Sequence, residues 1–264
     1  MSILKTDVDF GDLTTRIISG AALGVAALVA LSIGGLVAII AIAAATCAMI
    51  WEFRRIIGAP VEFQDYGFLV SIASVCLAII AAYIFNYGPF AAFGVLLIGA
   101  GALYRLEEDW SRKTLPGLLY IGWSMSVLAF MRGQIGLAPV LWIILVVIAA
   151  DVGGYFAGRM IGGPKLWPAV SPNKTWSGAV GGWALALVVG LIFWIGGWTG
   201  LAYLLPLSLG TAMASQAGDL FESSFKRHFG VKDASNLIPG HGGFMDRLDA
   251  LMGALLFFLL TWIG

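Results

Sequence analysis

The chain has 264 residues, of which 60% are hydrophobic and 11% are charged, and its formal net charge is zero. Soluble domains carry roughly 25% charged residues and about half apolar ones, so the mean hydropathy of +0.93 is too high for a soluble domain. The composition thus excludes a water-soluble globular protein, and the net charge gives no indication of a nucleic-acid partner.

Apolar runs of about 20 residues recur along the chain, and each is long enough to cross a hydrocarbon core of about 30 Å. The runs are continuous rather than alternating, which favours helices over a β-barrel. We predict an all-α, polytopic membrane bundle of about nine spans. Their ranges are 14–32, 35–53, 66–86, 89–104, 114–131, 137–160, 175–196, 200–222 and 245–263. We expect one integrated membrane domain, with N-terminal helices in residues 1–135 and C-terminal helices in residues 136–264.

The charged residues suggest how these spans are oriented. Three acidic residues precede the first span, where a cleavable signal peptide would have basic ones, so we expect no such signal. With nine spans, every one of the 15 Lys and Arg residues except Arg132 lies on the side of residue 1. Basic residues near span ends stay in the cytoplasm. We therefore expect a cytoplasmic N-terminus and, in a bacterial cell, insertion in the cytoplasmic membrane. Cys47 and Cys76 lie inside apolar runs and are expected to be buried, without disulfide spacing.

The first polar cluster, DVGGYFAGRMIGG, spans residues 151–163 at the end of an apolar run. On a helix, Asp151, Tyr155 and Gly158 share one face, and Arg159 lies one turn after Tyr155. A charge in the bilayer costs roughly 2.5–3.5 kcal/mol on insertion scales, so Asp151 is expected to have a partner or water. The cluster indicates either a functional site or a structural pair of Asp151 with Arg159 or with a base on another helix.

The second cluster, SPNKTWSGAVGG, spans residues 171–182. Ser171, Pro172 and Asn173 are typical of a turn, and Lys174 and Thr175 then begin an apolar helix. The free N–H groups at a helix N-terminus suit a phosphate, but an ordinary cap with a basic anchor would have the same sequence.

The third cluster approaches and includes the segment 223–249. Asp219, Glu222 and Lys226 share one helical face, and Asp246 and Asp249 open the last span. Carboxylates gathered in a low dielectric repel unless a cation holds them, and Mg²⁺ is usually bound by one or two carboxylates together with substrate phosphates.

The segment between these carboxylate pairs carries groups suited to anions. The bases are Lys226, Arg227 and Lys232, and a Gly-rich loop contains His241, Gly242 and Gly243. His241 is interpreted as a phosphate donor or a structural residue rather than a zinc ligand. Together these features indicate phosphoryl or nucleotidyl transfer; the alternative is a solvated charged loop.

The segment 223–249 resembles the signature of the CDP-diacylglycerol synthases, also called phosphatidate cytidylyltransferases. The matching positions are Ser223, Lys226, Arg227, Lys232, Asp233, His241, Gly242, Gly243, Phe244, Asp246, Arg247 and Asp249. The clusters around Asp151 and Lys174 resemble other polar stretches of the same family, although Ser177 stands where many relatives have an acidic or amide residue. The resemblance covers roughly residues 150–250.

The resemblance implies a reaction and a set of roles. CTP and phosphatidate would give CDP-diacylglycerol and pyrophosphate, with Mg²⁺ as cofactor. Asp219 and Asp246 would bind Mg²⁺, with Asp249 and Glu222 either as nearby ligands or as groups that support the ligands. The phosphates and the leaving pyrophosphate would be held by Lys226, Arg227, Lys232 and Arg247. The triphosphate or the lipid head group would be approached by Lys174 and by the loop of His241, Gly242 and Gly243, with Asp151, Tyr155 and Arg159 as further substrate contacts.

Two other functions remain open from the residues alone. A CTP-dependent lipid kinase would release CDP rather than pyrophosphate. An ion-coupled transporter would use Asp151, Asp219 and Asp246 as an ion path. Membrane lipids are expected partners in every case, and the resemblance adds a possible homodimer.

Overall fold

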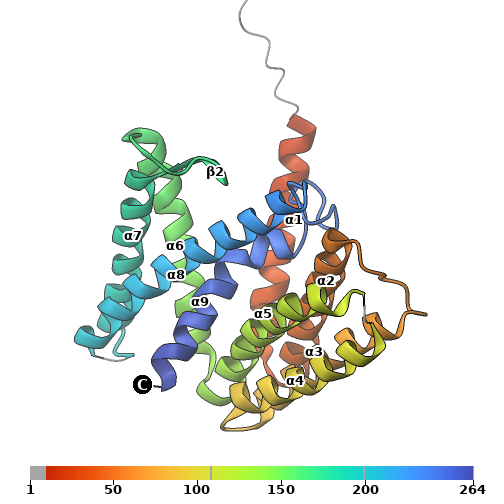
Figure 1. Cartoon of the computed structure of the whole chain (residues 1–264). Coiled ribbons are helices and arrows are strands. Elements are labelled where there is room, and N and C mark those ends of the chain that lie inside the picture. Colours follow the sequence, from red (N-terminus) through yellow and green to blue (C-terminus); the bar gives the residue numbers. More distant parts are fainter. Residues whose placement is uncertain (1–9, 108, 199, 264) are drawn as a thin grey trace, which may run out of the picture.

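The computed structural model describes residues 10–107, 109–198 and 200–263. Within these ranges the chain forms nine α-helices, one π-helical turn and one short β-hairpin (Figure 1). The helices are α1 (Phe10–Ile33), α2 (Gly35–Ile57), α3 (Tyr66–Ile84), α4 (Gly88–Leu106), α5 (Ser111–Phe130), α6 (Leu137–Met160), α7 (Trp176–Ile195), α8 (Leu201–His228) and α9 (Met245–Ile263). The π-helical turn η1 (Met131–Ile135) follows α5, and the strands β1 (Lys165–Trp167) and β2 (Ser171–Thr175) connect α6 to α7.

Each predicted span coincides with one of these helices, and most of the ends agree within a few residues. In the described part of the chain, the helices α2 to α7 are long and apolar enough to cross a membrane, with η1 extending α5. Helix α1 contributes a shorter apolar stretch, and α8 and α9 carry charged residues at the ends that face each other in the sequence. The chain is therefore an all-α integral membrane protein.

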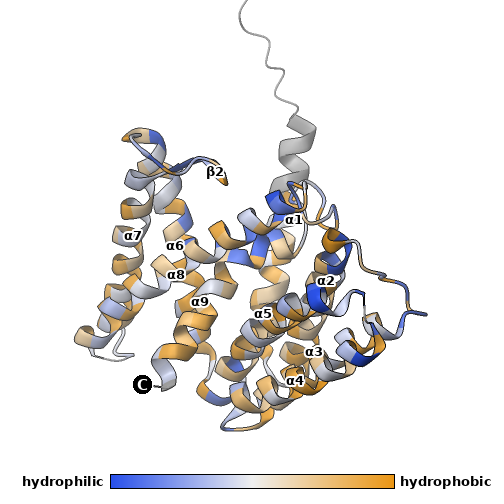
Figure 2. Cartoon of the chain, in the orientation of Figure 1, coloured by the Kyte–Doolittle hydropathy of each residue, from blue (hydrophilic) through white to orange (hydrophobic). Residues whose placement is uncertain are grey.

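The outer surface of the bundle is apolar. Large aliphatic side chains such as Ile98, Ile195 and Leu36 are 70–76% exposed. Exposure on this scale is unfavourable in water but matches the hydrocarbon interior of a bilayer. Figure 2 shows hydrophobic residues along the helices, with a concentration of hydrophilic residues where α8 approaches α9, beside α1.

The helices pack in two groups. Helices α2 to α5 contact one another closely, and so do α6 to α9, while α9 also contacts α2 and α5 (Figure 1). Within the second group, the buried Trp142 of α6 donates its indole N–H to the Ser208 Oγ of α8 at 3.1 Å. An indole N–H needs an acceptor when it is buried, so this bond fixes α6 against α8.

The connection between α6 and α7 corrects one prediction. Ser171, Pro172 and Asn173 are not a turn, because they belong to strand β2, which pairs antiparallel with β1. The turn lies at residues 168–170. Pro168 supplies the fixed φ of a turn residue, so the chain reverses earlier than we predicted, and the strand then leads directly into α7.

Helix α8 extends beyond the predicted span 200–222 into the segment 223–249. Helix α8 continues to His228, so Ser223, Lys226 and Arg227 are helical. Glu222 and Lys226 are one helical turn apart, and the ion pair between them, at 3.0 Å, favours this extension. The chain leaves the helix at Gly230, whose φ of +73° suits a glycine after a helix end.

Candidate active site

Helices α6 and α7 approach closely through glycines. A Cβ on Gly153 would lie 2.6 Å from the carbonyl oxygen of Gly181, and one on Gly178 would lie 2.7 Å from that of Gly154. Small residues of this kind let helices in a membrane pack backbone to backbone. The N-terminus of α7 is thereby held against α6, and Thr175 caps it by accepting a hydrogen bond from Gly178 N at 3.1 Å.

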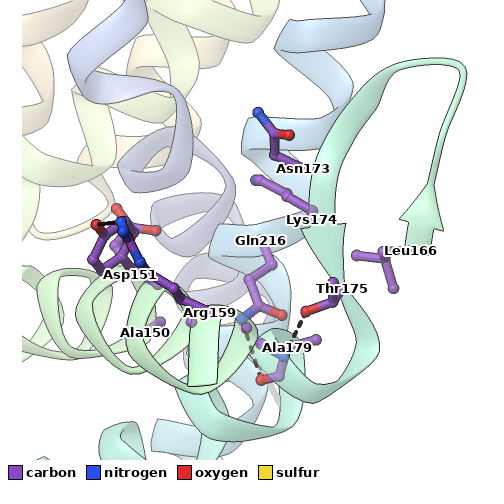
Figure 3. A pocket seen from close by; sticks show the side chains of 13 residues that line it. Ala150, Asp151, Arg159, Leu166, Asn173, Lys174, Thr175, Ala179 and Gln216 are labelled. Atoms are coloured by element: carbon purple, nitrogen blue, oxygen red, sulfur yellow. Dashed lines mark hydrogen bonds between the residues drawn. The ribbon is translucent and has the colours of Figure 1, made fainter. Parts of the chain in front are cut away.

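A polar cavity of about 540 Å³ lies at this junction. Figure 3 shows Lys174 and Thr175 reaching it from β2, and Asp151 and Arg159 from α6. Asp151 forms no hydrogen bond or ion pair with any described residue, which disfavours the structural pair with Arg159. It lies within electrostatic reach of Asp219, Lys174 and Arg247. An accessible carboxylate beside two cations fits a site for an anionic ligand and a metal ion.

Helices α8 and α9 cross at another pair of glycines. A Cβ on Gly218 would lie 2.7 Å from the carbonyl oxygen of Asp249 and 3.0 Å from Gly253 Cα. This contact between backbones places Asp219 and Glu222 of α8 beside Asp249 of α9. The side chains of Glu222 and Asp249 are in direct contact. The predicted meeting of two carboxylate pairs is therefore confirmed for these residues.

Two lysines balance the charge of these carboxylates. Lys174 forms an ion pair with Asp219, whose Oδ1 also accepts a hydrogen bond from Ser223 at 3.3 Å. Lys226 is 7% exposed and pairs with both Glu222, at 3.0 Å, and Asp246, at 2.5 Å. Lys226 thus connects α8 to α9 in this structure, and the phosphate contact predicted for it stays a prediction.

Asp246 organises the loop that precedes α9. Its Oδ2 accepts hydrogen bonds from the backbone N–H groups of Ala234 and Gly243, both at 2.8 Å, while its Oδ1 accepts from Lys226. Gly242 has a φ of +83°, and a Cβ there would lie 2.7 Å from Asp246 Oδ2. Glycine is required at such a position, so the Gly-rich loop folds around this carboxylate.

Sequence reasoning missed Glu52 of α2. This fully buried carboxylate accepts hydrogen bonds from Ser235 Oγ at 2.5 Å, Phe244 N at 3.0 Å and Met245 N at 2.7 Å. Gly243 packs against it so closely that a Cβ would lie 2.2 Å from Glu52 Oε1. The available signal was an acidic residue inside a predicted span, which is functional by default. Glu52 fixes the start of α9 and the signature loop to the N-terminal group of helices.

His241 and Arg247 connect the loop to its surroundings. The His241 Nδ1 lies 3.0 Å from the Ser19 Oγ of α1, and Arg247 donates its Nε–H to the His241 carbonyl oxygen at 2.9 Å. His241 therefore has the structural contacts of one of its two predicted roles. Arg247 is exposed and faces the region of Asp151.

The remaining predicted substrate-binding or catalytic residues are Tyr155, Arg159, Arg227 and Lys232. Tyr155 and Arg159 line the polar cavity, where Arg159 donates a 2.8 Å hydrogen bond to the Tyr155 hydroxyl. Arg227 is exposed and donates to the Val231 carbonyl oxygen at 3.1 Å. Lys232 is exposed. Neither Arg227 nor Lys232 forms an ion pair with a described acidic residue, so their predicted roles depend on a phosphate approaching from outside.

The carboxylates fit a Mg²⁺ ion that shares its ligands with a substrate. Both oxygens of Glu222 are buried and accept no hydrogen bond from a described residue, apart from the ion pair with Lys226. Such a group beside Asp249 and near Asp219 favours a cation. No three Asp, Glu, His or Cys side chains in the described ranges form a preformed metal site. One or two carboxylates plus phosphates and water are sufficient for Mg²⁺, and Asp219, Asp249 and Glu222 could provide them.

Comparison with known proteins identifies the family. The family model described as the cytidylyltransferase family matches residues 14–263. A phosphatidate cytidylyltransferase of Brucella suis is 38% identical over 255 residues, which cover 92% of this chain and 90% of that protein. Proteins of the same name from Haemophilus influenzae and Bacillus subtilis are 38% and 40% identical over 63% and 54% of this chain. This chain belongs to the cytidylyltransferase family.

Proposed function

We propose that this enzyme transfers a cytidylyl group from CTP to phosphatidate and so produces CDP-diacylglycerol and pyrophosphate for phospholipid synthesis. The observation that carries the proposal is the acid–base cluster where α8 crosses α9, which adjoins a polar cavity in an otherwise apolar membrane protein. The similarity to phosphatidate cytidylyltransferases over nine-tenths of the chain supports the same reaction.

The reaction requires two polyanions to meet. An oxygen of the phosphatidate phosphate attacks the α-phosphorus of CTP, and the bond from that phosphorus to the oxygen bridging the α- and β-phosphates breaks. The nucleophile already carries negative charge near neutral pH, so no strong general base is needed. Charge neutralisation and alignment must then supply most of the rate enhancement.

The position of each residue suggests its role in this reaction. Lys174 and the N-terminus of α7 would bind phosphates in the polar cavity, and Arg247 would hold the phosphatidate phosphate. Bound Mg²⁺ would neutralise phosphate charge, with Asp219, Asp249 and Glu222 as its nearest carboxylates. Asp246 and Glu52 would hold the loop and α9 in place, and the Mg²⁺ contact predicted for Asp246 stays a prediction. Arg227 and Lys232 would contact the triphosphate or the departing pyrophosphate from the surface.

The location follows from the distribution of charge. We propose nine spans with the N-terminus in the cytoplasm, because this arrangement puts the basic residues on one side. The site would then face the cytoplasm, which supplies CTP, in the cytoplasmic membrane of a bacterial cell. A homodimer is proposed on the family resemblance alone, and the mass of the purified detergent complex would test it.

The assay should follow the α-phosphate and the γ-phosphate of CTP separately. Purified enzyme in mixed micelles receives phosphatidate, Mg²⁺ and CTP labelled at the α- or the γ-phosphate. We expect the α label to enter lipid while an equal amount of pyrophosphate forms. Entry of the γ label with release of CDP would identify a lipid kinase. If neither label moves in folded protein, the proposal is wrong, and ion flux in liposomes would test the transporter alternative.

A further inference from the structure

A second cavity, of about 420 Å³, lies among α1, α2, α5, α6 and α9 and is almost entirely apolar. Its volume lies within the range of about 300–1,000 Å³ that is typical of ligand sites. Its rim includes Leu28 of α1 and Leu145 and Ile148 of α6, which are 43–51% exposed. These side chains face the surroundings of the bundle, so the cavity opens toward the hydrocarbon of the bilayer.

Helix α6 connects this apolar cavity to the polar one. Ile144 and Ile148 line the apolar cavity, and Asp151 and Tyr155 line the polar cavity. These residues recur at intervals of three and four, so they form one stripe on a single face of the helix. The apolar part of the stripe ends one turn before Asp151. A ligand that follows this stripe would pass from hydrocarbon to the polar cavity.

Arg247 supplies the charge at the end of the apolar cavity. It is the only charged side chain among the described residues that line the cavity. Its Nε–H is held by the carbonyl oxygen of His241, while its two terminal amino groups have no acceptor among the described residues. A fixed guanidinium with open donors at the end of an apolar cavity is complementary to an anionic head group on a hydrocarbon chain.

We infer that this cavity binds an acyl chain of phosphatidate while Arg247 holds its phosphate. The inference rests on the proposed function and assigns the hydrocarbon part of that substrate to named residues. The α6 residues that line the cavity run from Leu141 to Ile148, a rise of about 10 Å at about 1.5 Å per residue. That is about a third of a hydrocarbon core of about 30 Å, so the cavity can hold a large part of one acyl chain.

The way α1 packs fits lateral access for a lipid. Among the helices, α1 packs mainly against α2. It is attached to the bundle at two places: Ser19, inside the helix, contacts Pro239 and His241, and Arg132 donates to the carbonyl groups of Leu31 and Ser32 at its C-terminal end. Between these attachments the cavity separates α1 from α6, which leaves room for a chain to enter between the two helices.

Gly24 allows the cavity to be filled without disturbing the fold. It lines the cavity, and a Cβ at this position would have no neighbour within 4 Å. Gly101 of α4 is a matched control, because its Cβ would also meet open space and it does not line the cavity. The variants Gly24→Phe and Gly101→Phe would be assayed with dioleoyl and dioctanoyl phosphatidate, with CTP varied separately.

We expect Gly24→Phe to raise the KM for dioleoyl phosphatidate by about fourfold for each methylene group that it excludes. The KM for CTP should not change, the dioctanoyl substrate should be less affected, and Gly101→Phe should match the unmodified enzyme. Equal effects on both lipids, or no effect on either, would overturn the inference while leaving the proposed function intact. The proposed function fails separately if the unmodified enzyme makes no CDP-lipid from either substrate.

Photolabelling tests the occupant without any substitution. A phosphatidate with a diazirine in the middle of one acyl chain should label the segment around Leu28 or that around Leu145. Excess unlabelled phosphatidate should suppress this labelling, and phosphatidylcholine should not. If both lipids compete equally, the cavity holds ordinary bilayer lipid, and the assignment to the substrate is wrong.

Discussion

The residue that connects the two carboxylate pairs is Lys226. Its ammonium group lies between Glu222 and Asp246 in a site that water barely reaches. Removing one partner of a buried ion pair leaves an uncompensated charge. The free-energy cost of that charge exceeds the net stabilisation that the pair provides. Lys226 therefore contributes to the stability of the α8–α9 contact as well as to the charge balance of the site.

We predict that Lys226→Met lowers the free energy of unfolding by roughly 3–5 kcal/mol, because it leaves two buried carboxylates facing each other. Unfolding in mixed micelles of mild detergent and SDS would measure the loss. Lys232→Met is the matched control, since Lys232 is exposed and has no ion pair with a described residue. Equal stability of the two variants would contradict the role given to Lys226.

Glu52 acts on the site from another helix. Its carboxylate accepts from two backbone N–H groups, one at each oxygen, and from one hydroxyl. A glutamine has only one acceptor oxygen, and its NH₂ group would face a backbone donor. Gln is therefore not a conservative replacement here, although its shape is nearly the same.

We predict that Glu52→Gln lowers kcat by about tenfold or more, since losing a hydrogen bond to a charged group costs roughly 1.5–3 kcal/mol. The change should fall on kcat more than on the KM for CTP, because Glu52 lies behind the loop rather than in the cavity. Glu62→Gln, at an exposed position after α2, should remain within about twofold, as surface substitutions usually do. A normal kcat for Glu52→Gln would remove Glu52 from the site.

At the scale of the helices, contacts between backbones decide where the charged groups lie. Gly218 and Gly253 let α8 and α9 cross with their backbones in contact, and this crossing brings the acidic residues together. A methyl group at Gly218 would force the two helices apart. In an open part of a helix the same change is favourable by roughly 0.5–1 kcal/mol, because alanine loses less backbone entropy than glycine.

We therefore expect opposite signs for two identical substitutions. Gly218→Ala should lower both stability and activity, while Gly101→Ala should be neutral or slightly stabilising and leave activity unchanged. Thermal unfolding and the cytidylyl-transfer assay on the same preparations would compare them. If Gly218→Ala behaves like Gly101→Ala, the α8–α9 crossing tolerates displacement, and its close packing does not position the site.

At the scale of the whole molecule, two groups of helices meet along α9. Glu52 of α2 binds the start of α9, and Phe53 of α2 stacks on Phe225 of α8 with ring centroids 5.0 Å apart. The N-terminal helices thereby support the loop that the catalytic cluster depends on. The division at residues 135 and 136 within one membrane domain stays a prediction.

The proposed orientation gives a direct prediction. Phe63 precedes α3 and Tyr87 precedes α4, and their exposed fractions are nearly equal at 80% and 79%. Nine spans with a cytoplasmic N-terminus place them on opposite sides of the membrane. With Cys47 and Cys76 replaced by Ala, Tyr87→Cys should react with an impermeant maleimide in intact cells. Phe63→Cys should react only after permeabilisation, and the reverse pattern would invert the topology.

The sequence by itself determined the class of protein, the helices and the family. Long apolar runs can satisfy their backbone groups in a bilayer only as helices, so nine helices could be predicted with nearly correct bounds. The spacing of Asp219, Glu222 and Lys226 along one helix also followed from periodicity.

Only the tertiary structure decided which of these charged groups meet. Lys174 of strand β2 pairs with Asp219 of α8. Glu52 accepts a hydrogen bond from the backbone N–H of Phe244, 192 residues later in the chain. The apolar cavity is bounded by five helices. Helical periodicity fixes which residues share a face, but it carries no information about which faces of distant helices come together. That depends on close backbone packing at glycines such as Gly178 and Gly218, and on buried polar groups that must find partners.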